Sequence, residues 1–238
     1  MRSIFVGIEY AGKTTLINLL AEYYHRLKVP THNDDHFTIP DATLSPESRA
    51  LMVNFPDDVK ERMQRMQIYY HIGIIRDYAK PLISGWYIEE AIYAGMYGED
   101  PDSSYYQSYN YGAHQTYEAQ VTEAHLPDIV LIHVTASDEA IRQRMKSDPH
   151  EYQFIKEGDI PEIKQRFDEE VDKSLFTQKR AKIVIDTTAK APTQSFDELL
   201  PLSERLITFG ELAIRALPIP SDNYEVRYEN GVRKIIPT

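Results

Sequence analysis

A short glycine-bearing stretch near the start of the chain, GIEYAGKTT at residues 7–15, restricts the fold more than any other part of the sequence. Gly7, Gly12, Lys13 and Thr14 fit the pattern G-x-x-x-x-G-K-[ST]. In this pattern consecutive backbone N–H groups point inward and bind phosphate oxygens where a helix begins. The pattern has this meaning only when a strand precedes it and a helix follows it.

Both flanks of the stretch meet that condition. Ser3 to Ile8 is a short apolar run that ends at a glycine-bearing turn, which predicts a buried parallel strand. From Thr14 to Leu27, apolar residues recur at helical spacing, which predicts a helix. We therefore expect Lys13 to reach the β- and γ-phosphates of ATP and the Thr14 hydroxyl to bind Mg²⁺. The residues expected to contact ATP are Gly7, Glu9, Tyr10, Ala11, Gly12, Lys13, Thr14 and Thr15.

Beyond the loop, strand-like and helix-like segments alternate to about residue 216. Further strands are expected at 29–32, 81–86, 128–134 and 181–188, and helices at 56–78, 87–98, 137–145, 159–174 and 194–216. This alternation predicts an α/β fold with a parallel five-stranded sheet and helices on both faces. We predict one domain over 1–216 and a tail over 217–238. Two alternating runs around Glu229-Asn230-Gly231 indicate a β-hairpin in the tail.

The composition fits a folded protein and limits its partners. Of 238 residues, 42% are apolar, and 17 tyrosines and 8 phenylalanines suit a packed core. The net charge is −11 and no basic stripe appears, which disfavours nucleic acid as a partner. The absence of cysteine excludes disulfides, thiolate metal sites and a cysteine nucleophile. No apolar run approaches the ~18 residues of a membrane span, so we expect a cytoplasmic protein. The oligomeric state stays open, with a homodimer among the alternatives.

Three stretches resemble known kinases. FVGIEYAGKTTL is similar to the opening of thymidylate kinases, which reads like F-E-G-x-D-G-x-G-K-T-T-L. LPDIVLIHVTASDEAIRQRM is similar to a later strand and an arginine-bearing helix of the same family. MQIYYHIGIIRD looks more like a base-contacting helix of deoxynucleoside kinases. The resemblance implies the three-layer P-loop kinase fold, the use of ATP with Mg²⁺, and a small-molecule nucleoside or nucleotide as acceptor.

The resemblance also implies roles for single residues. Glu9 falls on the acidic position of the family's loop, so Glu9 and Thr14 are candidate Mg²⁺ ligands. Asp34 and Asp35 follow the second expected strand, where a carboxylate can orient or deprotonate an acceptor hydroxyl, or hold Mg²⁺ through water. A helix cap or a solvated turn is the alternative. The amide of Gln67 can recognise a base because it donates and accepts hydrogen bonds at once. A solvated helix face explains Gln67 almost as well.

A basic helix and the segment after it resemble the mobile lid of these kinases. Arg142 and Arg144 lie in the helix, and the lid is expected at about 147–158. Arginine there neutralises the charge that develops on the transferred phosphoryl group. The alternative is an exposed basic helix face, and the sequence does not choose between the two arginines.

One departure from the relatives bears on the acceptor. Their third strand ends in an acidic residue followed by arginine, and the matching pair here is Gly85-Trp86. Trp86 either stacks on a base or belongs to the core. Glu89 and Glu90 come just beyond and can bind an acceptor hydroxyl. A monophosphate acceptor instead needs fixed cations, for which Arg62, Arg65 and Arg76 are candidates.

On this basis we predict an ATP-dependent kinase of a (deoxy)nucleoside monophosphate. Two alternatives keep the chemistry and change the acceptor: a deoxynucleoside kinase, or a kinase of another hydroxyl such as a modified base in DNA. A further alternative is a regulatory nucleotide-binding module without an acceptor. The lid-like basic segment and the lack of a guanine-selecting N-K-x-D stretch weigh against that alternative.

Overall fold

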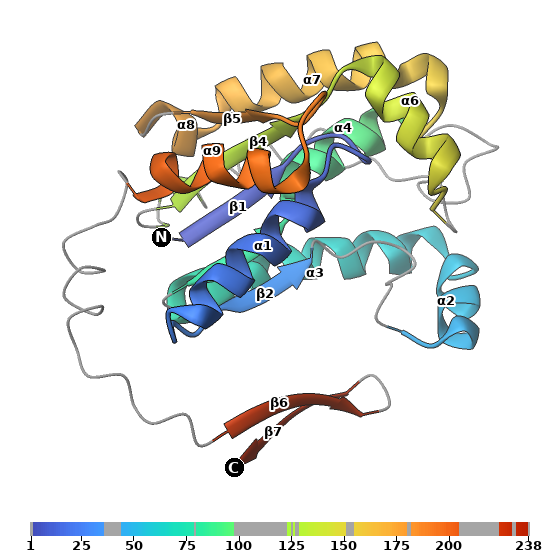
Figure 1. Cartoon of the computed structure of the whole chain (residues 1–238). Helices are drawn as coiled ribbons and strands as arrows, with labels where there is room; N and C mark the ends of the chain where they lie inside the picture. Colours follow the sequence, from blue (N-terminus) through green and yellow to red (C-terminus); the bar gives the residue numbers. More distant parts are fainter. Residues whose placement is uncertain are drawn as a thin grey trace.

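Five parallel strands form a sheet with helices on both of its faces (Figure 1). The computed structural model describes residues 2–35, 44–78, 80–97, 123–124, 126, 129–150, 155–179, 182–204, 224–229 and 232–237. The strands are β1 (Arg2–Val6), β2 (His32–Asp35), β3 (Pro81–Ser84), β4 (Ile129–Thr135) and β5 (Ile183–Asp186). Their order is β2-β3-β1-β4-β5, so β1 lies between β3 and β4.

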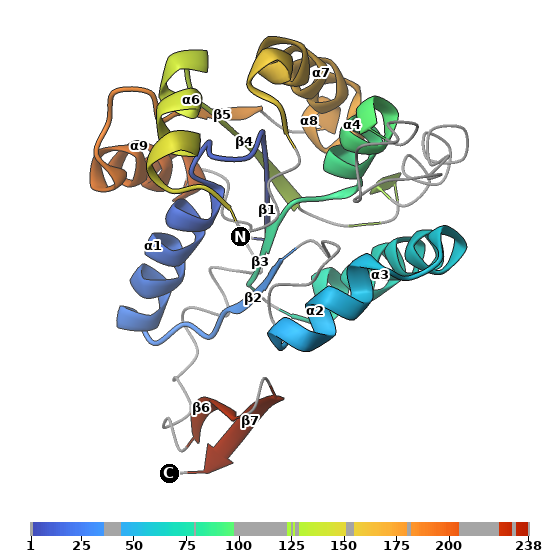
Figure 2. The ribbon, with the colours of Figure 1, turned by 90° about the vertical axis from the view of Figure 1, so that its right-hand side faces the viewer.

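Helices cover both faces of this sheet and complete three layers. On one face α1 (Lys13–Arg26) packs against α9 (Pro192–Glu204), and on the other α4 (Tyr87–Tyr97) packs against α7 (Ile160–Lys173) (Figure 2). The other helices are α2 (Pro46–Val53), α3 (Asp57–Asp77), α6 (Asp138–Ser147), the short 3₁₀ turn η1 (Glu157–Asp159) and α8 (Leu175–Lys179). β1 and β4 are buried along nearly their whole length, as in parallel sheets covered on both faces. The predicted fold class is confirmed.

Two further observations complete the outline. β6 (Tyr224–Glu229) and β7 (Val232–Pro237) form a separate antiparallel pair, which is the predicted hairpin. Within the described residues, none of the helices is both long enough and apolar enough to cross a bilayer.

The second strand lies three residues later than the sequence pattern predicted, because Val29 ends a helix instead of beginning a strand. Lys28 adopts a left-handed conformation with φ 55° after the last turn of α1. The Val29 N–H then donates to the Tyr24 carbonyl at 2.9 Å, and the Lys28 N–H donates to the His25 carbonyl at 2.8 Å. This pair of bonds is the Schellman motif that closes many helices.

The helices differ from the prediction in three other places, one of which is α8, a short helix in a stretch where none was expected. α2 was not predicted, although Ser45 caps it and a proline occupies its first turn. The last expected helix, 194–216, begins at Pro192 and is described to Glu204, and residues 205–216 lie outside the described part of the chain. Residues 151–154 of the expected lid also lie outside it.

Gly7 sets the point where β1 ends and the glycine-rich loop begins. Its φ is 149°, and a Cβ atom built there would meet the Val134 carbonyl oxygen at 2.0 Å. Only glycine therefore lets the loop start against the neighbouring strand β4. The loop consequently lies at the carboxyl end of the central strand, which is the edge where ligands bind in open α/β sheets.

Replacing Gly7 by alanine should lower the free energy of unfolding by about 2 kcal/mol or more, because the new methyl group must displace backbone. Gly73→Ala is the matched control. Gly73 lies within α3 and an added Cβ there meets nothing within 4 Å, so alanine should raise stability by up to about 1 kcal/mol. Urea unfolding of both variants measures the difference. Equal stability of the two variants would contradict this account of Gly7.

Candidate functional site: a phosphate-binding loop

The loop between β1 and α1 has the backbone geometry of an anion cradle. Tyr10 has φ 63° and Gly12 has φ 99°, both left-handed. Gly12 is the N-cap of α1 and makes no side-chain cap bond, whereas Ser45 and Ser137 cap α2 and α6 with their hydroxyls. The first N–H groups of α1 thus have no capping side chain at their end of the helix. These groups and the positive end of the helix dipole are suited to phosphate oxygens.

Lys13, the first residue of α1, folds back over the loop. Its Nζ atom donates to the Gly7 carbonyl at 2.6 Å and to the Ile8 carbonyl at 3.4 Å. The same atom lies 3.3 Å from Oε1 of Glu89. The lysine charge is therefore held at the loop, where it can reach a bound phosphate chain. The Thr14 side chain next to it is exposed, so its hydroxyl is accessible to a ligand.

One face of α4 supports the first half of the loop. Glu89 Oε1 accepts the Gly7 N–H at 3.3 Å, and Tyr93 Oη accepts the Glu9 N–H at 3.2 Å. Glu89 and Tyr93 are four residues apart, so both lie on the same side of the helix. Burial raises the pKa of Tyr93 well above its usual value, and the nearby Glu89 and Glu9 carboxylates add to the shift. Tyr93 consequently stays protonated.

Arg144 and Thr187 support the second half of the loop. The Arg144 guanidinium donates to the Tyr10 carbonyl at 2.8 Å, to Thr187 Oγ1 at 3.0 Å and to the Thr187 carbonyl at 2.8 Å. Thr187 Oγ1 in turn donates to the Ala11 carbonyl at 2.8 Å. These bonds connect α6, the residue after β5 and the loop. Arg144 therefore holds the loop in place.

Glu9 and Tyr10 turn toward the start of the lid-like segment. The Tyr10 ring stacks on the His150 ring at 4.1 Å between centroids, and the His150 N–H donates to Tyr10 Oη at 2.9 Å. Glu9 Oε2 lies 3.7 Å from His150 Nδ1. Hydrogen bonding to Glu9 raises the pKa of His150 above its ordinary value, against the opposing effect of burial. These contacts link the loop to the segment after α6.

Asp34 and Asp35 are the last two residues of β2 and do not follow the strand as the sequence pattern predicted, and this end of β2 lies at the same edge of the sheet as the loop. Asp35 pairs with Ser84 of β3, and Ser84 pairs with Phe5 of β1. Asp34 Oδ2 lies 3.8 Å from Nε2 of His32 and 3.9 Å from Nε2 of the fully buried His71. The Asp34 carboxylate therefore faces two imidazoles. The side chains of Asp35 and Gln67 are not among those that the structure describes.

Gly85 and Trp86, which replace the relatives' acidic–arginine pair, have structural explanations. Gly85 has φ 79°, a left-handed conformation that an acidic side chain rarely adopts. Trp86 is 1% exposed and packs near the rings of His71, Tyr87 and Phe176, which favours the core alternative. The acidic side chain that contacts the loop is Glu89, four residues after Gly85.

A buried carboxylate braces the start of α4 and was not anticipated from the sequence. Glu123 is fully buried, and its oxygens accept hydrogen bonds from the Tyr87 hydroxyl at 2.8 Å, the Ser174 hydroxyl at 2.9 Å and the Leu175 N–H at 2.6 Å. Burial raises the pKa of Glu123, and these donors oppose the shift. The network fixes Tyr87 relative to α8.

The other predicted residues are spread over the molecule. Glu90 is buried beside Glu89, with 1% exposure. Arg142 is partly exposed, and among the described residues it has no ion pair. Arg76 is exposed and bonds to Asp77. It lies next to Ile75, whose carbonyl accepts from the first residue of β1, so Arg76 is at the opposite edge of the sheet from the loop.

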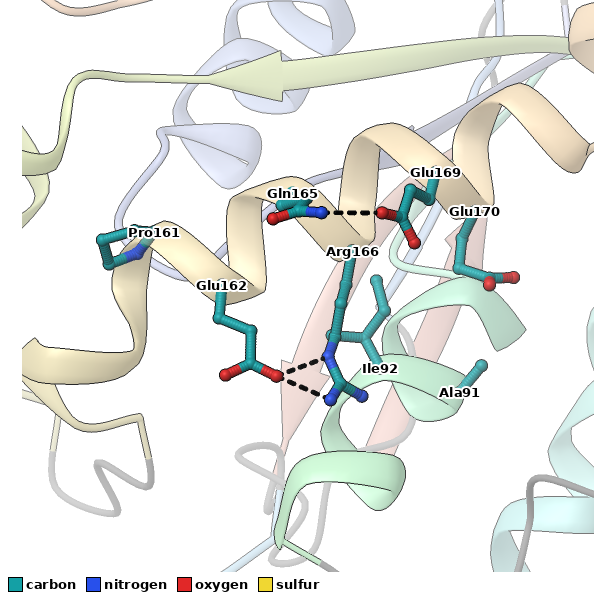
Figure 3. A pocket seen from close by; sticks show the side chains of 8 residues that line it. All are labelled: Ala91, Ile92, Pro161, Glu162, Gln165, Arg166, Glu169 and Glu170. Atoms are coloured by element: carbon teal, nitrogen blue, oxygen red, sulfur yellow. Dashed lines mark hydrogen bonds and ion pairs between the residues drawn. The ribbon is translucent and has the colours of Figure 1, made fainter.

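A groove of about 630 Å³ lies between α4 and α7, away from the loop (Figure 3). Its lining residues are Ala91, Ile92, Pro161, Glu162, Gln165, Arg166, Glu169 and Glu170. The Arg166 guanidinium bonds to Glu162, and the Gln165 amide bonds to Glu169. The single arginine is thus already paired with Glu162, and two further glutamates, Glu169 and Glu170, line the walls, so this groove does not suit phosphate.

Sequence reasoning identified the loop but not its supports. Tyr93 could have been found from its spacing of four residues from Glu89. Thr187 lies within an expected strand, 181–188, yet no local pattern signals its bond to a loop more than 170 residues away. The stacking of His150 on Tyr10 likewise has no sequence signature.

The Glu9–His150 contact leads to a prediction for histidine titration. Glu9→Gln should return the His150 pKa toward the ordinary value of about 6.5, because the neutral amide no longer stabilises the imidazolium. Since the folded-state pKa is raised, the contact stabilises fully below about pH 6.5 and loses its effect as the pH rises through the raised pKa. The effect on stability should be small, because His150 is about half exposed.

Histidine proton NMR over a pH series measures this shift, and Glu162→Gln, on α7, serves as the control. An unchanged His150 pKa in Glu9→Gln would show that the two side chains do not interact in solution.

Comparisons with known proteins agree with the architecture. No family model and no curated protein matches the sequence. Among solved structures, thymidylate kinase from Candida albicans is similar, with 16% identity over 98% of this chain and 96% of that chain and a TM-score of 0.60. Deoxyadenosine kinase from M. mycoides with bound dCTP is also similar, with 14% identity over 86% of this chain and 100% of that chain and a TM-score of 0.56. These likenesses confirm at the level of fold the predicted resemblance, and the chain has the fold of the P-loop kinases.

Proposed function

We propose that this protein is an ATP-dependent kinase that transfers the γ-phosphoryl group to a (deoxy)nucleoside monophosphate. The observation that carries the proposal is the loop from Gly7 to Thr15, with Lys13 folded over it and the first turn of α1 free of a side-chain cap. The loop lies at the carboxyl edge of the sheet, beside β3 and β4, which is where ligands bind in open α/β sheets.

The reaction needs positioning and charge neutralisation more than covalent work by the protein. The bond between the γ-phosphorus and the β–γ bridging oxygen breaks, and a new bond forms to an oxygen of the acceptor. ADP leaves with the electron pair of the broken bond, and any proton of the acceptor is lost to a base. Thr14, with its exposed hydroxyl, would help to hold Mg²⁺, which would supply positive charge to the phosphates during the transfer.

Each group of predicted residues has a place in this proposal. Lys13 and the loop N–H groups hold the phosphates of ATP, and Thr14 contributes its exposed hydroxyl to Mg²⁺. Arg142 is the better candidate for neutralising the transferred phosphoryl group, because Arg144 already braces the loop. Residues 147–158 act as the lid. On the acceptor side the candidates are Asp34, Asp35, Gln67 and Glu89, because Trp86 and Glu90 are each only 1% exposed.

A second acceptor class, the neutral deoxynucleoside, is favoured by two observations. Trp86 stands where the relatives have a phosphate-clamping arginine, and Arg76 lies at the far edge of the sheet. A monophosphate would therefore need cations from elsewhere on α3, where Arg62 and Arg65 are available. The thymidylate-kinase-like loop sequence supports the monophosphate, which we retain as the proposed acceptor.

Lys13→Ala should reduce phosphoryl transfer by at least about 100-fold while the protein stays folded, because it removes the lysine that reaches the β- and γ-phosphates. The assay measures ADP formation with Mg²⁺ over a panel of nucleosides and monophosphates. Lys173→Ala is the control, since Lys173 is an exposed partner of Glu170 on α7. Equal rates in wild type and Lys13→Ala would refute the role of the loop.

Competition between thymidine and thymidine monophosphate should identify the acceptor class. For a monophosphate, Arg62→Ala or Arg65→Ala should raise its KM about tenfold, the typical loss for one charge-assisted contact. Arg76→Ala, at the opposite edge, should leave the KM unchanged. Preference for thymidine that none of these variants alters would instead establish a deoxynucleoside kinase.

A further inference from the structure

Glu89 places a negative charge against the lysine that is expected to bind phosphate. Its Oε1 atom lies 3.3 Å from Lys13 Nζ and also accepts the Gly7 N–H at 3.3 Å. Each of the two charged side chains is only 12% exposed, so solvent ions screen this pair less than a surface pair. A fixed carboxylate at this position repels phosphate, and its presence at an anion site calls for a physical reason.

The rest of α4 holds Glu89 in place. The residue lies in the first helical turn, and its backbone N–H donates to the Trp86 carbonyl at 2.9 Å. The neighbouring Ile88 and Ile92 are buried in the core, and Tyr93 accepts a loop N–H one turn later. Because the helix is anchored on both sides, the carboxylate stays close to the loop when a nucleotide binds.

A divalent cation resolves the conflict between this carboxylate and a phosphate chain. In the free protein the negative charge of Glu89 offsets the positive charge of Lys13. ATP without Mg²⁺ would therefore bind next to loop N–H groups and an ion pair that has no net charge. Mg²⁺ binds phosphate oxygens, keeps several water ligands and typically uses only one or two protein carboxylates. One protein carboxylate is therefore enough to hold the Mg²⁺ ion of a bound nucleotide. In the described residues no group of three or more acidic or histidine side chains could form a separate metal cage.

We propose that Glu89 is the carboxylate that holds the Mg²⁺ ion of the bound nucleotide, through the ion's water ligands, and that it makes nucleotide binding depend on Mg²⁺. This inference rests on the proposed function. Glu9, the acidic residue within the loop sequence, differs in its surroundings, because its carboxylate faces His150 of the lid-like segment. Glu89 contacts the phosphate-binding lysine itself.

The test compares nucleotide affinity with and without Mg²⁺. Isothermal titration calorimetry with a non-hydrolysable ATP analogue gives the factor by which Mg²⁺ tightens binding in wild type, Glu89→Gln, Glu9→Gln and Glu162→Gln. In Glu89→Gln this factor should fall about fivefold or more, the scale of a typical coupling between two sites. Metal-free binding should be equal or tighter, since a repulsive charge is gone. Melting temperatures check that each variant is folded.

Other outcomes overturn the inference. If Glu89→Gln weakens nucleotide binding by the same factor with and without Mg²⁺, Glu89 only positions Lys13. The Mg²⁺ ion would be held by another group if Mg²⁺ tightens nucleotide binding by the same factor in Glu89→Gln as in wild type. The same holds if this factor falls only in Glu9→Gln. If the wild type does not bind the analogue under either condition, the proposed function fails and this inference fails with it. Binding by wild type with no coupling to Glu89 refutes the inference alone.

Discussion

The close approach of Gly7 to the Val134 carbonyl is the constraint on which the rest of the site depends. It ends β1 against β4 and starts the loop at the carboxyl edge of the central strand. The neighbouring strands then bring their following segments to the loop: α4 after β3, α6 after β4, and Thr187 after β5. The loop is consequently braced on both halves, by Tyr93 on one side and by Arg144 with Thr187 on the other.

Two glutamates, Glu9 within the loop and Glu89 in α4, have different partners. Glu9 faces His150 and ties the loop to the start of the lid-like segment. Glu89 faces Lys13, with its Oε1 atom 3.3 Å from the lysine Nζ. Gly85, directly after β3, has a left-handed conformation, which suits glycine, and Glu89 lies in the first turn of the helix that follows.

The sequence predicted the fold and the loop because both rest on local patterns. Apolar runs and helical spacing located most elements, and the spacing of Gly7, Gly12 and Lys13 located the loop between β1 and α1, for which phosphate binding stays a prediction. Val29 was assigned to a strand because its role in closing α1 depends on a left-handed residue before it, which lysine rarely signals. Arg144 was expected to act on the phosphoryl group, and its bonds to Tyr10 and Thr187 depend on the packing of three distant segments. Such contacts follow from the assembled fold, and no local pattern carries them.

The central claim is that the loop from Gly7 to Thr15 holds the phosphates of ATP. A crystal structure of the protein with Mg²⁺ and a non-hydrolysable ATP analogue tests it most directly. We expect the phosphate chain inside the loop, with Lys13 Nζ moved from the Gly7 carbonyl to phosphate oxygens. A phosphate chain bound elsewhere, or Lys13 still bonded to the Gly7 carbonyl beside a bound analogue, would contradict the account.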